Sequence, residues 1–182
     1  AGSYNNTIMG DRRVATCMVN ADDPAHQGWT PHPLQRFGNA ILASPAGTGA
    51  VTCAATTATD LGSGDYTLEG NFRFNKLPTG ANLATLFGKW GAALNQRSYR
   101  LYLGGPLLDS GALTYQCSTD GTNGGVVTLF QWPWKPETGR WYHIALSRVS
   151  GQRRLFIDGG IQGLPFTGAN TYFAGSARTS VM

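Results

Sequence analysis

Charged residues are scarce in this chain of 182 residues, because Asp, Glu, Lys and Arg together make up 13% of it. Soluble domains usually contain about 25% of these residues. The scarcity disfavours a helical protein, since surface helices carry a strongly polar face. There are 14 basic and 10 acidic residues, for a formal net charge of +4, and the basic residues are dispersed. Without a basic stripe interleaved with aromatic residues, we expect no binding of nucleic acid.

Long apolar runs and cysteine motifs are also lacking. No apolar stretch approaches the roughly 18 residues of a membrane span, and no basic-then-apolar leader opens the sequence. We therefore expect no membrane insertion. The three cysteines, Cys17, Cys53 and Cys117, are too widely spaced for a metal motif. Free cysteines are usually buried small side chains, which favours a reducing compartment. One disulfide beside one free thiol stays open as the alternative.

Glycine and proline are plentiful, at 25 and 9 residues, and aromatic residues make up 11%. The clearest strand is predicted over residues 66–74, where apolar and polar side chains alternate with a period of two. Tight turns are predicted at Ser150-Gly151 and Asp158-Gly159. Other strands are predicted at residues 40–44, 50–55, 83–90, 98–103, 113–117, 126–130, 140–148, 153–157, 172–174 and 180–182. This pattern predicts an all-β fold built as a two-sheet antiparallel sandwich.

The first 37 residues form a separate section in this interpretation. Alternation over residues 13–19 predicts a strand that pairs with residues 6–9 across Gly10-Asp11. Several prolines follow, as is typical of a loop. We expect residues 1–37 to be an N-terminal arm, or a first strand with a long loop, and residues 38–182 to be the sandwich.

A series of short motifs carries a resemblance to a known family. In order they are Phe37-Gly38, the run Gly64-Asp65-Tyr66-Thr67-Leu68-Glu69, the run Trp141-Tyr142-His143-Ile144-Ala145-Leu146, and Leu155-Phe156-Ile157-Asp158-Gly159. The chain resembles the concanavalin A-like lectin/glucanase superfamily in its laminin G-like branch. It is most similar to modules in virion proteins of tailed bacteriophages and in large bacterial surface proteins.

The resemblance implies a jelly-roll topology over roughly residues 37–161. It implies that the motif residues Asp65, Tyr66, Trp141, His143, Asp158 and Gly159 serve packing and turning. Because relatives usually end with one more strand, the resemblance also implies that the sandwich lacks its last strand. Residues 1–19 or a partner would then cover an open sheet edge.

Catalytic residues are not expected. The superfamily's hydrolases carry a Glu-x-Asp-x-Glu pattern, and this sequence has only Glu69 and Glu137 and no such motif. A surface ion pair is the simpler account of Glu69, and His143 is interpreted as a half-buried strand residue. We therefore expect a protein that is not an enzyme.

Glycan binding is the candidate activity of the aromatic residues. Trp132 and Trp134 flank a proline in a predicted loop, and Trp90 lies near Asn95 and Arg97. Such residues can stack on sugar rings and hydrogen-bond to hydroxyls. The alternative is that Trp132 and Trp134 cover a sheet end or a seam between subunits, which tryptophan also does well.

Calcium is the only cofactor that the sequence suggests, through loop oxygens of Asp109, Asp120 and Asn123. The alternative is that turns favour these residue types.

Three functions follow. The first is a non-enzymatic virion module of a tailed phage, which contacts other virion proteins, copies of itself or host-surface glycan. The second is a secreted or cell-surface bacterial carbohydrate-binding module. The third is a polysaccharide hydrolase.

Overall fold

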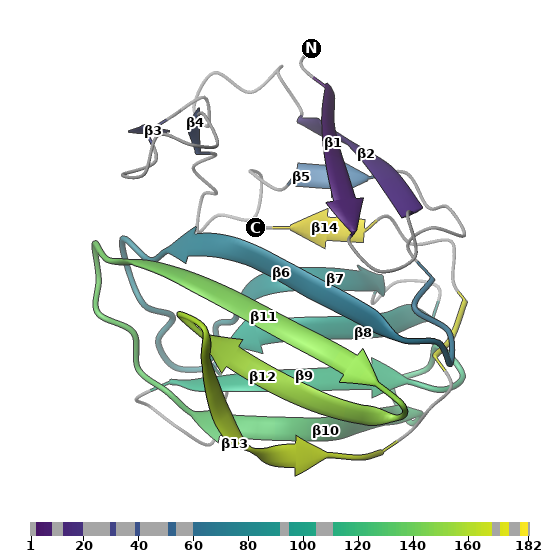
Figure 1. The fold of residues 1–182 in the computed structure, drawn as a ribbon. Coiled ribbons are helices and arrows are strands. Elements are labelled where there is room, and N and C mark those ends of the chain that lie inside the picture. The colour runs from purple at the N-terminus through teal and green to yellow at the C-terminus, as the bar shows by residue number, and fades with distance from the viewer. Residues whose placement is uncertain are drawn as a thin grey trace.

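The chain forms an all-β sandwich of two antiparallel sheets (Figure 1). The structure, a computed structural model, describes residues 60–91, 95–104, 111–168 and 172–174 together with the backbone of six outlying strands. No helix among the described residues is long and apolar enough to cross a membrane. The strands are β1 (Ser3–Ile8), β2 (Arg13–Val19), β3 (Thr30–Pro31), β4 (Asn39–Ala40), β5 (Val51–Cys53), β6 (Tyr66–Arg73), β7 (Ala84–Gly91), β8 (Gln96–Leu103), β9 (Ala112–Ser118), β10 (Val126–Pro133), β11 (Trp141–Val149), β12 (Gln152–Ile157), β13 (Gly160–Phe166) and β14 (Thr179–Val181).

The larger sheet has the strand order β1-β2-β5-β14-β7-β8-β9-β10, and the smaller has the order β13-β12-β11-β6. β3 and β4 pair with each other in a separate two-stranded sheet. The smaller sheet forms the front layer in Figure 1, with β7 to β10 behind it. β1, β2, β5 and β14 extend the larger sheet beyond β7. At the two sides of the sandwich, β10 contacts β13 and β1 contacts β6. The two sheets therefore meet along both edges.

Side-chain alternation explains why these segments form the sandwich. On β6, Tyr66, Leu68 and Phe72 are buried, whereas Glu69 and Arg73 are exposed. The inner faces of both sheets supply one apolar core, and its burial is the main force that holds the sheets together. The predicted period of two over this segment is confirmed.

A buried arginine lies at the centre of this core. Arg153 on β12 is fully buried, and its Nη2 donates to the Tyr172 hydroxyl at 2.7 Å. Its Nε donates to the hydroxyls of Tyr66 (3.2 Å) and Tyr172 (3.1 Å). The Tyr115 hydroxyl joins the group at 3.0 Å from that of Tyr66. Polar groups inside a sandwich are tolerated when they are hydrogen-bonded in this way.

Two predicted tight turns are confirmed. Val149 pairs with Gln152 and Ile157 pairs with Gly160, which leaves two-residue loops at Ser150-Gly151 and Asp158-Gly159. All four loop residues have positive φ angles, as a type I′ hairpin turn requires. The motif residue Asp65 stabilises the first of these turns, because its Oδ1 accepts from the Ser150 amide at 2.8 Å.

The structure differs from the sequence prediction in five places. β3 lies in the proline-rich segment that was predicted to be a loop. Residues 172–174 form no strand, because Tyr172 turns its side chain into the core. β13 is an additional strand, which was not predicted because its glycines and its proline are typical of a loop. β10 continues to Pro133, three residues beyond its predicted end. β11 is not buried on both faces, since Trp141 and His143 on its outer side are half-exposed.

The N-terminal section supplies strands to the larger sheet. β1 pairs with β2, with Asn6 opposite Ala15, so the predicted hairpin is present. β2 then pairs with β5, and β14 lies between β5 and β7. The expectation that a further last strand is missing stays a prediction.

Candidate ligand-binding face

The outer face of the larger sheet carries a row of polar and aromatic side chains. In the strand register, Arg100 on β8 lies opposite Gln116 on β9, and Gln116 lies opposite Thr128 on β10. The neighbouring residues Leu101 and Tyr115 are fully buried in the core. Since successive side chains of a strand point to opposite faces, the three polar residues face outward.

Arg100 is the centre of this row. Its guanidinium carbon lies 4.3 Å from the centre of the Trp90 ring and 4.7 Å from that of Tyr102. Its Nε and Nη2 donate to Gln116 Oε1 at 3.0 and 2.8 Å, and Gln116 Nε2 in turn donates to Thr128 Oγ1 at 3.0 Å. We name Trp90, Arg100, Tyr102, Gln116 and Thr128 the Arg100 face.

A glycine keeps the space beside Arg100 open. Gly88 lies directly opposite Arg100 in the register of β7 and β8. A Cβ atom at Gly88 would lie 3.4 Å from Arg100 Cβ and 3.2 Å from Thr85 Cγ2, which is tight for real side chains. Residues directly opposite on antiparallel strands are close neighbours. A larger residue there would compete with the guanidinium for its place over the two rings.

Arg97 and Asn95 lie at one end of the Arg100 face. A register shift in β7 and β8 places Trp90 opposite Arg97, and Arg97 Nη1 lies 3.5 Å from both Asn95 Oδ1 and the Gly121 carbonyl oxygen. Burial lowers the pKa of Arg100; the neighbouring Tyr102 opposes this shift, and the charge of Arg97 adds to it by a smaller amount. The structure thus brings Trp90, Asn95 and Arg97, which the sequence suggested, together with Arg100.

The other two predicted tryptophans lie elsewhere. Trp132 lies on the strand β10, not in a loop, and its ring stacks on that of Phe130 with an interplanar angle of 5°. Trp134 contacts Phe74 and Tyr142 edge-to-face, at 6.0 and 5.0 Å between ring centres. Both tryptophans are half-buried and pack against the core. β10 extends to Pro133 because Phe130 and Trp132, two residues apart on the strand, both pack against the core.

The proposed calcium ligands are arranged as a self-contained turn. Asp120 Oδ1 accepts from the Thr122 amide at 2.8 Å and from its hydroxyl at 2.9 Å, and these bonds lower the pKa of Asp120. The Asn123 carbonyl accepts from the Val126 amide. Asp109 lies outside the described residues. Within the described part of the chain, no group of three or more His, Cys, Asp or Glu residues is close enough to hold a metal ion.

Most described carboxylates have a structural partner. Glu69 Oε2 lies 3.3 Å from His143 Nε2 on the outer face of the smaller sheet, a contact that is an ion pair when His143 is protonated. Asp158 Oδ1 accepts from the His143 amide at 2.9 Å, and Asp158 Oδ2 from Arg140 at 3.1 Å. Asp60 pairs with the buried Lys89. Carboxylates in such roles hold turns and strands in place.

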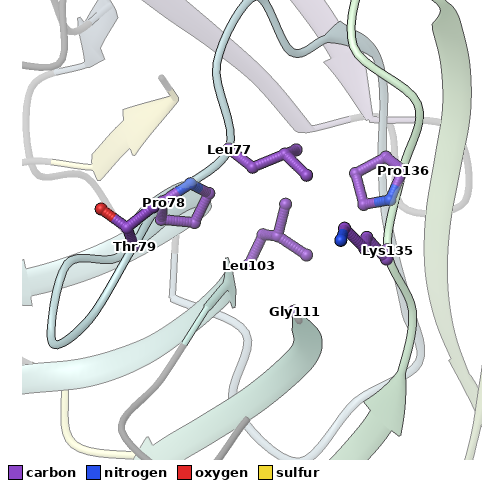
Figure 2. A pocket seen from close by; sticks show the side chains of 7 residues that line it. All are labelled: Leu77, Pro78, Thr79, Leu103, Gly111, Lys135 and Pro136. Carbon is purple, nitrogen blue, oxygen red and sulfur yellow. The ribbon is translucent and has the colours of Figure 1, made fainter. Parts of the chain in front are cut away.

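A small pocket opens at the sheet end where β8 stops and β9 begins (Figure 2). The side chains of Leu77, Leu103 and Pro136 point toward its centre. Its volume is about 170 Å³, below the roughly 300–1,000 Å³ of typical small-molecule pockets. The lining of mostly apolar side chains offers no convergent set of hydrogen-bonding groups, so the Arg100 face is the stronger candidate.

Comparison with known proteins shows similarity of fold only. No protein-family model and no curated protein matches the chain. Among solved structures, it is similar to domain 4 of AbnA, a GH43 extracellular arabinanase from Geobacillus stearothermophilus, with 16% identity and a TM-score of 0.53. The match covers 85% of this chain and 65% of that one, so this chain spans less than two thirds of the other's length.

Two further structures are less similar. The carbohydrate-binding module CBM66 from Bacillus subtilis is 11% identical, with a TM-score of 0.45 and coverage of 85% of this chain and 83% of that one. The enzymatically active domain of tailspike protein 2 from bacteriophage CBA120 is 17% identical, with a TM-score of 0.46 and coverage of 79% and 22%.

Sequence reasoning missed Arg100, Tyr102, Gln116 and Thr128. Each lies in a predicted strand, and the alternation alone marks it as outward-facing. Their meeting depends on the register of four strands, which a single sequence does not specify.

Proposed function

We propose that this protein is a non-catalytic carbohydrate-binding module that holds a saccharide on the Arg100 face. The observation that carries the proposal is the half-exposed Trp90 ring beside a guanidinium, an amide and a hydroxyl arranged across neighbouring strands. A sugar ring offers an apolar face for stacking and hydroxyls for hydrogen bonds. An open sheet surface with these groups suits an extended chain of sugars.

The fold supports the proposal in a general way. The arabinanase domain of similar fold was solved in complex with arabinotriose, which makes a saccharide the first ligand to test here. An extracellular or cell-surface location goes with such a ligand. The engaged carboxylates Glu69, Asp120 and Asp158 support the non-catalytic part of the proposal.

Affinity electrophoresis against soluble polysaccharides tests the proposal. Arabinan, xylan, galactan and polygalacturonate in the gel should include one that retards the wild-type protein. Trp90→Ala should weaken this binding about thirtyfold, because truncation of an aromatic anchor costs about 2 kcal/mol or more. Trp141→Ala is the matched control, since Trp141 lies on the outer side of the smaller sheet and is also half-buried. Equal losses in both variants would contradict the assignment of the face.

A virion module is the second candidate, favoured by one observation. β13 is an edge strand, and a bulge between its pairings with Arg153 and Leu155 leaves Leu164 87% exposed. Exposed Ile161 lies on the same strand. An exposed apolar edge is typical of a contact with another protein chain.

Solution mass tests the second candidate. A virion module that associates with copies of itself should form oligomers or assemblies in light scattering, and Leu164→Lys should dissociate them. A protein that stays monomeric at every concentration and binds polysaccharide would favour the carbohydrate-binding module.

A further inference from the structure

We propose that the Arg100 face recognises the carboxylate of an acidic, uronate-containing polysaccharide. This inference rests on the proposed function and specifies its ligand. Its starting point is a pair of arginines whose charges are not neutralised by carboxylates. Lys89 and Arg140 form ion pairs with Asp60 and Asp158, whereas neither Arg97 nor Arg100 forms an ion pair with a described carboxylate.

Neutral groups hold both arginines instead. Arg100 donates to the amide oxygen of Gln116, and Arg97 to the Asn95 side chain and the Gly121 carbonyl. These acceptors orient the guanidinium groups but leave their positive charge intact. Two cations on one sheet face repel each other. An incoming anion would relieve this repulsion.

Arg100 also has donors to spare. A guanidinium carries five N–H groups, and the described residues take one from Nε and one from Nη2. The remaining N–H groups lie in the plane of the guanidinium. A carboxylate accepts two parallel hydrogen bonds in that geometry, which makes the pair both strong and directional.

The aromatic rings around Arg100 are the reason to expect that the carboxylate belongs to a sugar. Trp90 and Tyr102 hold the guanidinium over their faces at 4.3 and 4.7 Å, which fixes its orientation before any ligand arrives. Trp90 is half-exposed, so a pyranose would pack against the part of its ring that Arg100 does not cover. Gln116 and the exposed Thr128 extend the row of hydrogen-bonding groups across two more strands.

Calorimetric titration with oligogalacturonate tests the inference, with the fully methyl-esterified oligomer as the matched neutral ligand. The ester keeps the sugar chain and removes the charge. We expect the acid to bind about tenfold more tightly than the ester, because a hydrogen bond to a charged group contributes about 1.5 kcal/mol or more. Ionic strength near 1 M should erase most of the difference, since the screening length falls to about 3 Å.

Substitutions at matched arginines complete the test. Arg100→Gln should bind acid and ester equally, whereas Arg100→Lys should keep part of the preference because it keeps the charge without the planar fork. Arg154→Gln is the control, because the Arg154 guanidinium donates to the neutral Gln152 side chain and lies on the smaller sheet. It loses the same charge far from this face. Unchanged melting midpoints would establish that the variants are folded.

The outcomes separate this inference from the proposed function. Equal, Trp90-dependent binding of acid and ester would overturn the inference and leave the carbohydrate-binding function standing. Tighter binding of dextran sulfate than of oligogalacturonate would overturn the assignment to a carboxylate. Binding of no polysaccharide at all would overturn the proposed function itself.

Discussion

Removing one hydroxyl from the buried arginine cluster should destabilise the protein strongly. The Tyr172 hydroxyl accepts from Arg153 Nη2 at 2.7 Å and Nε at 3.1 Å, inside a core that excludes water. Tyr172→Phe keeps the ring contacts and removes both acceptor bonds. Hydrogen bonds to charged groups contribute about 1.5–3 kcal/mol each, so we expect a loss of about 3 kcal/mol in the free energy of unfolding. For a domain of this size the melting midpoint falls by about 10 °C.

Two other variants make the test specific. Tyr142→Phe removes a hydroxyl that accepts from the neutral Glu137 amide at 2.8 Å, and we expect it to cost about 1 kcal/mol. Arg153→Met should cost less than Tyr172→Phe, because the hydroxyls of Tyr66, Tyr115 and Tyr172 lie 2.8 to 3.3 Å apart and can bond to one another. Urea titrations of the three variants measure these differences. Equal losses in Tyr172→Phe and Tyr142→Phe would refute the reasoning.

Two further predictions concern the core and a loop. Burial raises the pKa of Tyr66 above its ordinary value of 10.0. The stabilisation by the protonated Tyr66 is therefore complete below that pH, and above it the free energy of unfolding falls by about 1.4 kcal/mol per pH unit. Urea titrations at alkaline pH should show a smaller fall in Tyr66→Phe than in the wild type, and parallel curves would contradict this. Gly125→Ala would place a Cβ atom 2.0 Å from Asp120 Oδ1, so the carboxylate must move away and lose its bonds to Thr122, at a cost of about 1–3 kcal/mol. An unchanged melting midpoint would be inconsistent with the described turn.

Much of the fold could be predicted from the sequence because buried and exposed side chains alternate along a strand, so apolar and polar residues alternate in the sequence. The alternation over residues 66–74 and the paired turn residues Asp158-Gly159 each specify local structure without distant partners. β13 could not be predicted, because its run of Gly160 to Phe166 has little alternation and gains its place by pairing with β12. Tyr172 resembles a strand residue in sequence, and its role depends on Arg153 from another strand.

The candidate site could be predicted only in part. In the sequence, Trp90 and Arg97 could be recognised as an aromatic residue and a nearby cation, and in the structure they lie opposite each other on β7 and β8. Trp132 stood out for the same reason, yet it packs against Phe130. Whether a strand tryptophan faces solvent or the core depends on bulges such as the one between Thr128 and Phe130, and a single sequence does not reveal these.

The central claim is that the outer face of the larger sheet holds the saccharide. Amide chemical shifts of labelled protein, followed by NMR as oligogalacturonate and its methyl ester are added, test it most directly. The account predicts saturable shifts at residues 88–90, 100–102, 116 and 128 and none on β6 or β11. Shifts confined to the outer face of the smaller sheet, or no saturable shifts with either ligand, would contradict it.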